Sequence, residues 1–162
     1  MELTDKKIMK YWTEKDVLKL KNARTFEDVG KIAIEVQNRM PDEIGHLCGP
    51  MSTGGLGNIE DNLINFENIL IKLSQDYQIY NQLPLEDGIY RIVKKLNETN
   101  SYNPEDLLNA IYKPLFDSKK LKKVFFINDW ESSQGTTWEN NYFKENRKDV
   151  ELIYLEKDYL MK

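Results

Sequence analysis

Cysteine and histidine are almost absent from this 162-residue chain, which contains one of each, Cys48 and His46. One cysteine cannot form a disulfide within the chain, and the pair cannot supply the Cys/His sets of structural zinc sites. We therefore expect a reducing, cytoplasmic setting and neither a metal nor an organic cofactor. The same counts argue against Cys–His proteases and two-histidine zinc hydrolases. If the chain is an enzyme, carboxylates and hydroxyls carry its chemistry.

Long apolar runs and an excess of positive charge are also missing. The longest apolar runs are short, such as residues 124–127, and residues 1–7 lack the apolar stretch of a secretory signal. Lys and Arg number 23 against 27 Asp and Glu, so the formal net charge is 23 − 27 = −4. A membrane span, a secretory signal and a nucleic-acid partner are therefore not expected, because phosphate binding favours a basic surface.

The opening third of the chain reads as helical. Apolar residues recur every three or four positions from Thr25 to Arg39, which predicts a helix that Pro41 ends. A short, charge-rich helix is expected before it, over residues 13–21. We interpret residues 1–43 as an N-terminal helical extension packed on the core, and residues 44–162 as the main domain.

The main domain alternates strands with helices. We expect strands at 44–48, 77–81, 123–127 and 151–155, and helices at about 58–73, 86–96, 104–115 and 138–144. Such alternation is typical of right-handed crossovers. It predicts an α/β protein, a three-layer α/β/α Rossmann-like fold with a parallel sheet of four or five strands. Ligands bind beyond the carboxyl ends of such strands, so the loops after Cys48, Tyr80 and Ile127 are the candidate site.

The loop after the first of these strands is rich in glycine. Residues 49–57 contain Gly49, Gly54, Gly55 and a fourth glycine, together with Ser52, and they lead into a helix. Free backbone N–H groups at a helix start can bind an anion or a sugar. The loop has neither a Walker A lysine nor the GxGxxG dinucleotide pattern. The alternative is a flexible strand-to-helix turn.

The loop after the third expected strand concentrates carboxylates, hydroxyls and indoles over residues 129–139. Glu139 lies one turn into the helix that follows, so its side chain can lean back toward the loop. The positive end of that helix favours its ionised form. An ionised carboxylate beside a bound sugar is the nucleophile of retaining glycosyl transfer. The alternative makes Glu139 an ordinary helix residue and Asp129 a turn former.

Together the two loops resemble a known family. The segments CGPMS at 48–52 and WESSQGTTWE at 130–139 are similar to those of the nucleoside 2-deoxyribosyltransferase-like superfamily, which includes nucleoside 5′-monophosphate N-glycosidases. The resemblance covers about residues 44–155. Its most specific part is the pattern Ser-x-Gly-x-x-x-Glu from Ser133 to Glu139.

The resemblance implies a mechanism and a set of site residues. Glu139 would attack C1′ of the deoxyribose, and Asp129 or Asp117 would protonate or orient the base. Ser133 stands where the monophosphate hydrolases bind the 5′-phosphate, which favours a nucleotide over a nucleoside. The remaining residues assigned to the sugar, the base or the 5′ group are Gly49, Ser52, Gly54, Gly55, Asn81, Trp130 and Gly135.

The chain also departs from the family. The first strand lacks the tyrosine that often orients the nucleophile, and the glycine loop lacks the arginine of the hydrolases. We interpret His46 and Cys48 as core residues, since no histidine or basic cluster is expected beside the thiol. The alternative function is a catalytically silent nucleotide-binding or sensor domain.

The expected partners are a small nucleoside or nucleotide and a second copy of the chain. A shallow site at one sheet edge needs a cover to exclude water, which favours a homodimer or a larger homo-oligomer. Apolar residues near Trp12, or in the tail at 159–161, are expected to be exposed for that contact.

Overall fold

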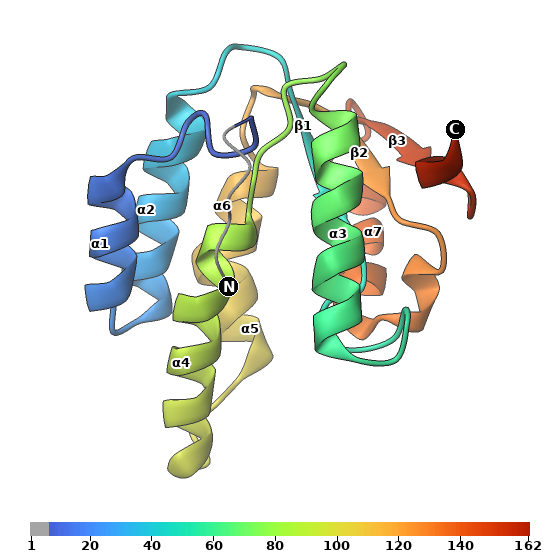
Figure 1. Ribbon diagram of the computed structural model, residues 1–162. Coiled ribbons are helices and arrows are strands. Elements are labelled where there is room, and N and C mark those ends of the chain that lie inside the picture. The colour runs from blue at the N-terminus through green and yellow to red at the C-terminus, as the bar shows by residue number, and fades with distance from the viewer. Residues whose placement is uncertain (1–6) are drawn as a thin grey trace. The chain divides into compact units, whose positions relative to one another are not determined.

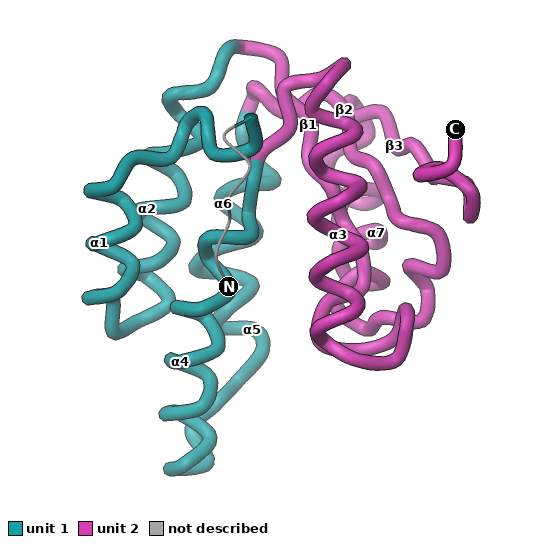
Figure 2. Tube along the Cα trace, in the orientation of Figure 1, with its two compact units in different colours: residues 1–41, 81–118 teal, residues 42–80, 119–162 magenta. Residues whose placement is uncertain are grey.

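The computed structural model describes residues 7–162, and the chain divides into two compact units (Figure 2). Unit 1 contains the residues up to Pro41 together with 81–118, and unit 2 contains 42–80 and 119–162. Residues 1–6, over which no secretory signal was expected, lie outside the described residues. The chain therefore enters unit 2 after Pro41, returns to unit 1 at Asn81 and ends in unit 2.

Unit 1 is helical (Figure 1). Its elements are α1 (Glu14–Asn22), α2 (Phe26–Asn38), the 3-10 turn η1 (Leu83–Leu85), α4 (Glu86–Glu98), and a helix formed by α5 (Pro104–Leu107), the π-helical η2 (Leu108–Tyr112) and α6 (Lys113–Phe116). The predicted helices over this part of the chain are confirmed.

The starts of α1 and α2 are fixed by the same local device. The side chains of Thr13 and Thr25 each accept a hydrogen bond from the backbone N–H three residues on, and the carboxylates of Asp16 and Asp28 accept one from the backbone N–H of the same threonine. These capping boxes satisfy backbone donors that a helix start leaves without partners. Asp16 has a second role. It binds Arg39 at 2.5 and 2.8 Å, which lowers the pKa of the Asp16 carboxyl to about 2 and joins the two helices.

The interior of unit 1 depends on close packing and buried amide contacts. A Cβ added at Gly30 would lie 2.1 Å from the carbonyl oxygen of Ala110, so α2 can approach η2 closely only with glycine there.

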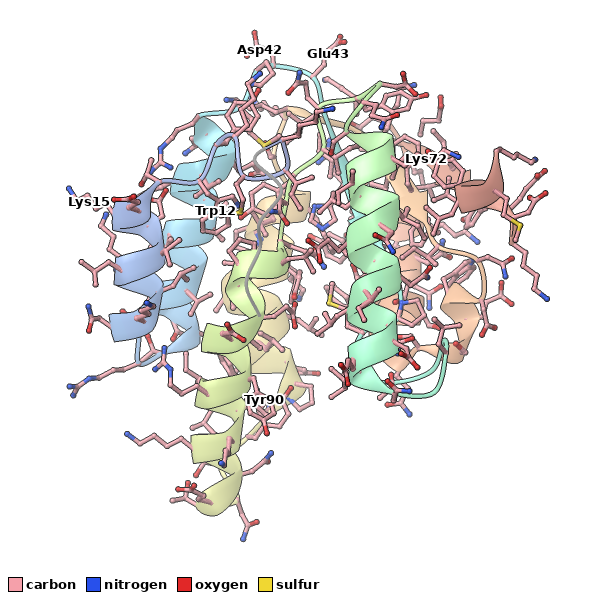
Figure 3. All side chains as sticks on the ribbon, in the orientation of Figure 1. Trp12, Lys15, Asp42, Glu43, Lys72 and Tyr90 are labelled. Atoms are coloured by element: carbon pink, nitrogen blue, oxygen red, sulfur yellow. The ribbon has the colours of Figure 1, made fainter. Side chains whose placement is uncertain are left out.

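Trp12 is 8% exposed, lies among the helices of unit 1 (Figure 3), and donates its indole N–H to the Asn81 carbonyl at 2.9 Å. The expectation that Trp12 is exposed for a neighbouring copy is therefore wrong. The indole can be buried because the Asn81 carbonyl, in the same unit, accepts a hydrogen bond from its N–H.

Unit 2 is an α/β structure with a parallel sheet, as predicted. Its strands β1 (Ile44–Cys48), β2 (Leu121–Phe126) and β3 (Glu151–Tyr154) pair in the order β1-β2-β3. Helix α3 (Ile59–Leu73) lies in front of the sheet in Figure 1 and α7 (Gln134–Asn146) behind it. The short 3-10 turns η3 (Trp130–Ser132) and η4 (Tyr159–Met161) complete the unit.

The prediction of four or five strands is wrong, because the described residues form three. The segment expected as a strand at 77–81 makes one parallel bridge, between Gly45 and Ile79. Gly45 donates to the Gln78 carbonyl at 2.8 Å and accepts from the Tyr80 N–H at 2.9 Å. The chain then turns into η1, whose second residue is Pro84, so the pairing ends after a single residue.

The bridge nevertheless fixes the topology of unit 2. From β1 the chain runs through α3 to Ile79, on the edge of β1 away from β2. From β2 it runs through α7 to β3, on the other side. The direction of winding therefore changes between β1 and β2. In parallel sheets, ligands bind in the crevice at such a change, beyond the carboxyl ends of the strands.

Glu86 gives unit 1 an unusual dependence on pH. One carboxyl oxygen of Glu86 is buried with no hydrogen-bond partner among the described residues, and burial, with a smaller effect of Asp87, raises the pKa to about 7. Because the pKa of Glu86 in the folded protein lies above its ordinary value of 4.5, the contribution of Glu86 to the free energy of unfolding is fully present below pH 4.5. That contribution is lost as the pH rises through about 7. We expect Glu86→Gln to remove this loss and to stabilise the protein at pH 8 by at most about 3 kcal/mol.

Urea unfolding at pH 5 and pH 8 measures this effect. Glu98→Gln is the matched control, since Glu98 is exposed and lies on the same helix, α4. The wild type and the control should lose stability between the two pH values, whereas Glu86→Gln should lose much less. Equal losses in all three proteins would show that Glu86 does not titrate in this range.

Candidate functional site

The loops after β1 and β2 meet at the change of winding. The backbone N–H of Gly55 donates to Ser132 Oγ at 2.7 Å, and Ser132 Oγ in turn donates to the carbonyl oxygen of Asp129 at 2.7 Å. One hydroxyl thus links two loops that are more than seventy residues apart in the chain. The structure brings together the two segments that the sequence analysis selected.

The glycines of the first loop are held in a defined shape. Gly54 and Gly55 have φ values of 68° and 61°, the left-handed region that side chains rarely adopt. A Cβ at Gly54 would lie 2.3 Å from the Ser132 carbonyl oxygen, and one at Gly55 would lie 2.5 Å from Asn62 Oδ1. The loop is therefore a turn packed closely against Ser132 and Asn62, and its two glycines have conformations that other residues rarely adopt.

Asn62 holds the glycine loop from inside and was missed by the sequence analysis. Its Nδ2 donates to the carbonyl oxygens of Met51 and Gly54, each at 3.0 Å, and its Oδ1 accepts from the Leu56 N–H at 2.8 Å. The side chain is 3% exposed. The sequence could have indicated its role, because Asn62 is a polar residue on the face of α3 that is otherwise apolar and buried, and buried polar groups need hydrogen-bond partners.

The second loop carries a backbone outlier at its candidate acid. Asp129 has φ 68° and ψ 22°, left-handed values for a residue that is not glycine, and its side chain is exposed. Strained conformations of this kind cluster at functional sites. Trp130, next to it, is half-buried, and its ring centroid lies 5.6 Å from that of Phe126 and 5.8 Å from that of Tyr154. The indole therefore packs on the end of the sheet.

Helix α7 begins directly after this loop. Ser133 is its N-cap: Oγ accepts from the Thr136 N–H at 3.3 Å, and the residue is 5% exposed. Gly135 is exposed in the first turn, and Glu139 is half-buried one turn further on. The serine is thus engaged in holding the helix start that positions Glu139.

Glu139 reaches the side chains of β1. Residues two apart on a strand face the same side, and the donor atoms of His46, Cys48 and Glu139 all lie within 4.8 Å of one another. Burial, then the charge of Glu139 and a hydrogen bond with it, raises the pKa of the Cys48 thiol. Cys48 is therefore held as a neutral thiol beside the Glu139 carboxylate.

This cluster corrects the sequence analysis. We expected no histidine near Cys48, yet His46 lies beside it, with its ring stacked on Tyr80 at a centroid distance of 5.8 Å. Both β1 residues are 0% exposed, so the interpretation of His46 and Cys48 as core residues is confirmed. The i, i+2 spacing of the histidine and the cysteine was the signal that could have revealed the cluster.

A cavity of about 590 Å³ opens beside the two loops. Its walls include Gly55, Asn62, Asp129 and Glu131, and residues of the C-terminal segment such as Tyr159. Lys72 of α3 (Figure 3) holds that segment. Its ammonium donates to the Tyr159 carbonyl and lies 4.4 Å from the centroid of the Tyr159 ring. The acidic residues Asp129, Glu131 and Glu156 and one lysine, Lys157, line the cavity, and Glu156 also pairs with Lys162. Glu139 is not among the lining residues.

The other assigned residues lie in different places. Ser52 is exposed in the glycine loop, and Gly49 is buried against Ile127. Asp117 is exposed at the end of α6, in unit 1. Asn81 also belongs to unit 1, where its Nδ2 donates to the Ile8 carbonyl at 3.0 Å and its Oδ1 accepts from the Leu83 N–H at 3.1 Å. Glu139 and Asp129 therefore share unit 2, while Asp117 and Asn81 do not belong to it.

Comparison of the chain with protein-family models, with curated proteins and with solved structures found no significant match. Over residues 7–162, every helix is too short or too polar to cross a lipid bilayer.

The contact between the two loops predicts different effects for two glycines. We expect Gly54→Ala to cost at least about 1 kcal/mol more stability than Gly57→Ala, since left-handed strain costs about 1–3 kcal/mol at either position but only Gly54 faces a backbone neighbour. Gly57 has φ 96° and nothing within 4 Å of an added Cβ, so it serves as the control. Urea unfolding of both variants measures the difference, and equal losses would contradict the tight contact.

Proposed function

We propose that the protein cleaves or transfers the N-glycosidic bond of a nucleoside or nucleoside 5′-monophosphate, with Glu139 as the nucleophile, on a three-layer Rossmann-like domain. The observation that supports this most is the position of Glu139. It lies on α7 and is half-buried, and its carboxylate lies within 4.8 Å of the donor atoms of the β1 residues His46 and Cys48. A nucleophile needs such fixed geometry.

The proposed reaction has two steps. The Glu139 carboxylate forms a bond to C1′ as the C1′–N bond breaks, and the departing base takes a proton from an acid of the site. Water or a second base then attacks C1′, and Glu139 leaves as a carboxylate. Both steps pass through oxocarbenium-like transition states, which a nearby carboxylate stabilises.

Asp129 is the favoured acid for the departing base. It lies in the same unit as Glu139, follows the same strand, and has an exposed carboxyl on a strained backbone that lines the cavity. Asp117 is the alternative from the resemblance. It belongs to unit 1, so the case for it rests on the sequence alone.

The charge of the cavity favours a nucleoside over a monophosphate. Asp129, Glu131 and Glu156 outnumber Lys157 on its walls. Like charges repel a phosphate, and Ser133, the phosphate ligand suggested by the resemblance, is 5% exposed and caps α7. We therefore propose a neutral nucleoside as the preferred substrate.

A silent nucleotide-binding or sensor domain is the second candidate. One observation favours it: the cavity beside the two loops is lined by Gly55, Asn62 and Asp129, and Glu139 is not among its lining residues. Such a domain would bind nucleosides without releasing base. We also propose a cytoplasmic location and a homodimer or larger homo-oligomer, for which Leu160 and Met161, 42% and 89% exposed, offer apolar surface.

Substitution of Glu139 tests the catalytic proposal. We expect Glu139→Gln to reduce the release of free base from a nucleoside mixture by at least about 1,000-fold, because removing a nucleophile removes the covalent route. Chromatography of the bases measures this. Glu145→Gln is the matched control, an exposed glutamate on the same helix, and it should keep the wild-type rate. Unchanged base release by folded Glu139→Gln would refute the mechanism.

A further inference from the structure

His46, Cys48 and Glu139 form a cluster of three different ligand types. The imidazole and the thiol come from neighbouring positions on one face of β1, and the carboxylate comes from α7. Their donor atoms lie within 4.8 Å of one another. His46 and Cys48 are fully buried and Glu139 is half-buried, so the cluster lies inside unit 2.

These distances suit a small metal ion. Ligands bound tetrahedrally to zinc at 2.0–2.3 Å lie about 3.5 Å apart, and side-chain rotation can close the difference from 4.8 Å. The donors are held on a strand and a helix, and rigid elements position ligands better than loops do. Three protein ligands would leave a fourth position for water.

The donor chemistry selects the kind of ion. Mg²⁺ and Ca²⁺ prefer oxygen ligands, whereas a thiolate together with an imidazole favours zinc and its close chemical relatives. On binding, the Cys48 thiol gives its proton to solvent, and thiolate and carboxylate then carry two negative charges. A divalent cation neutralises them, so the buried centre has no net charge.

We propose that His46, Cys48 and Glu139 bind one zinc-type divalent cation, and that the bound ion removes Glu139 from glycosyl transfer. The second half of this proposal rests on the proposed function, and the first half does not. The protein would then have a metal-free active state and a metal-bound inactive state, with the same carboxylate used in each.

Cobalt(II) tests the ion site without any assay of activity. A thiolate bound to Co²⁺ gives a near-ultraviolet charge-transfer absorption, and the chain has a single cysteine, so the signal can arise only from Cys48. Titration of the full-length protein with Co²⁺ should produce the band at one equivalent per chain, and Zn²⁺ should abolish it. No band at saturating Co²⁺, or a band that is complete at half an equivalent, would overturn the site within one chain.

Variants test the other two ligands. His46→Gln and Glu139→Gln should each weaken Co²⁺ binding at least about 10-fold, since even groups that only support a ligand contribute 10–100-fold. Glu145→Gln, on the exposed side of α7, should leave it unchanged. Circular dichroism checks that each variant is folded. If His46→Gln does not fold, the wild-type titration still decides the proposal, and full affinity in folded His46→Gln or Glu139→Gln would contradict it.

Base release tests the second half. One equivalent of Zn²⁺ should abolish wild-type turnover and a chelator should restore it, whereas His46→Gln should need at least about 10-fold more Zn²⁺ relative to its own metal-free rate. Activation by Zn²⁺, or no effect once the cobalt band shows the site filled, would overturn the inhibition. Absence of base release in the metal-free protein would refute the proposed function and leave the cobalt result standing.

Discussion

The parallel pairing of β1 with β2 places every part of the candidate site. Its register sets Cys48 opposite Phe126, and the Ile127 N–H donates to the Cys48 carbonyl at 2.9 Å. Both strands therefore end at the same level, and their following loops start side by side. Because the helices after the two strands leave in opposite directions, these loops are not covered by their own connections. The Gly55–Ser132 hydrogen bond and the cavity follow from that arrangement.

The start of α7 determines where Glu139 lies. Ser133 caps the helix immediately after the second loop, so the next turn carries Glu139 back against the face of β1. The carboxylate lies beside a buried thiol there. The same proximity to His46 and Cys48 makes the carboxylate a potential metal ligand. The proposed catalysis and the proposed metal binding would therefore compete for one side chain.

Local patterns predicted most of the fold. The helix starts at Thr13, Thr25 and Asn58 are cap positions whose physics involves three or four neighbouring residues, and the three strands follow continuous apolar runs. The strand predicted at 77–81, which forms only one bridge, shows where prediction from local patterns ends. Its apolar residues are strand-like, but pairing depends on where the chain turns next, which no local pattern sets.

The contacts of the site were less predictable than its loops. The sequence selected both loops and Glu139, since glycine and clustered carboxylates are visible locally. It missed Asn62 because the partners of that amide are created by the loop's own fold. It misjudged Trp12 because the partner of the indole, Asn81, comes from a distant part of the chain. The error at Cys48 was different, because His46 is only two residues away and its place on the same face of the strand could have been predicted.

The covalent role of Glu139 is the central claim, and mass spectrometry of the intact protein tests it most directly. The metal-free protein is mixed with a 2′-fluoro deoxynucleoside analogue, which slows the second step, and quenched in acid. The account predicts one added glycosyl group per chain, located by peptide mapping on the segment that contains Glu139. Release of base without any adduct, or an adduct on a different residue, would contradict the account.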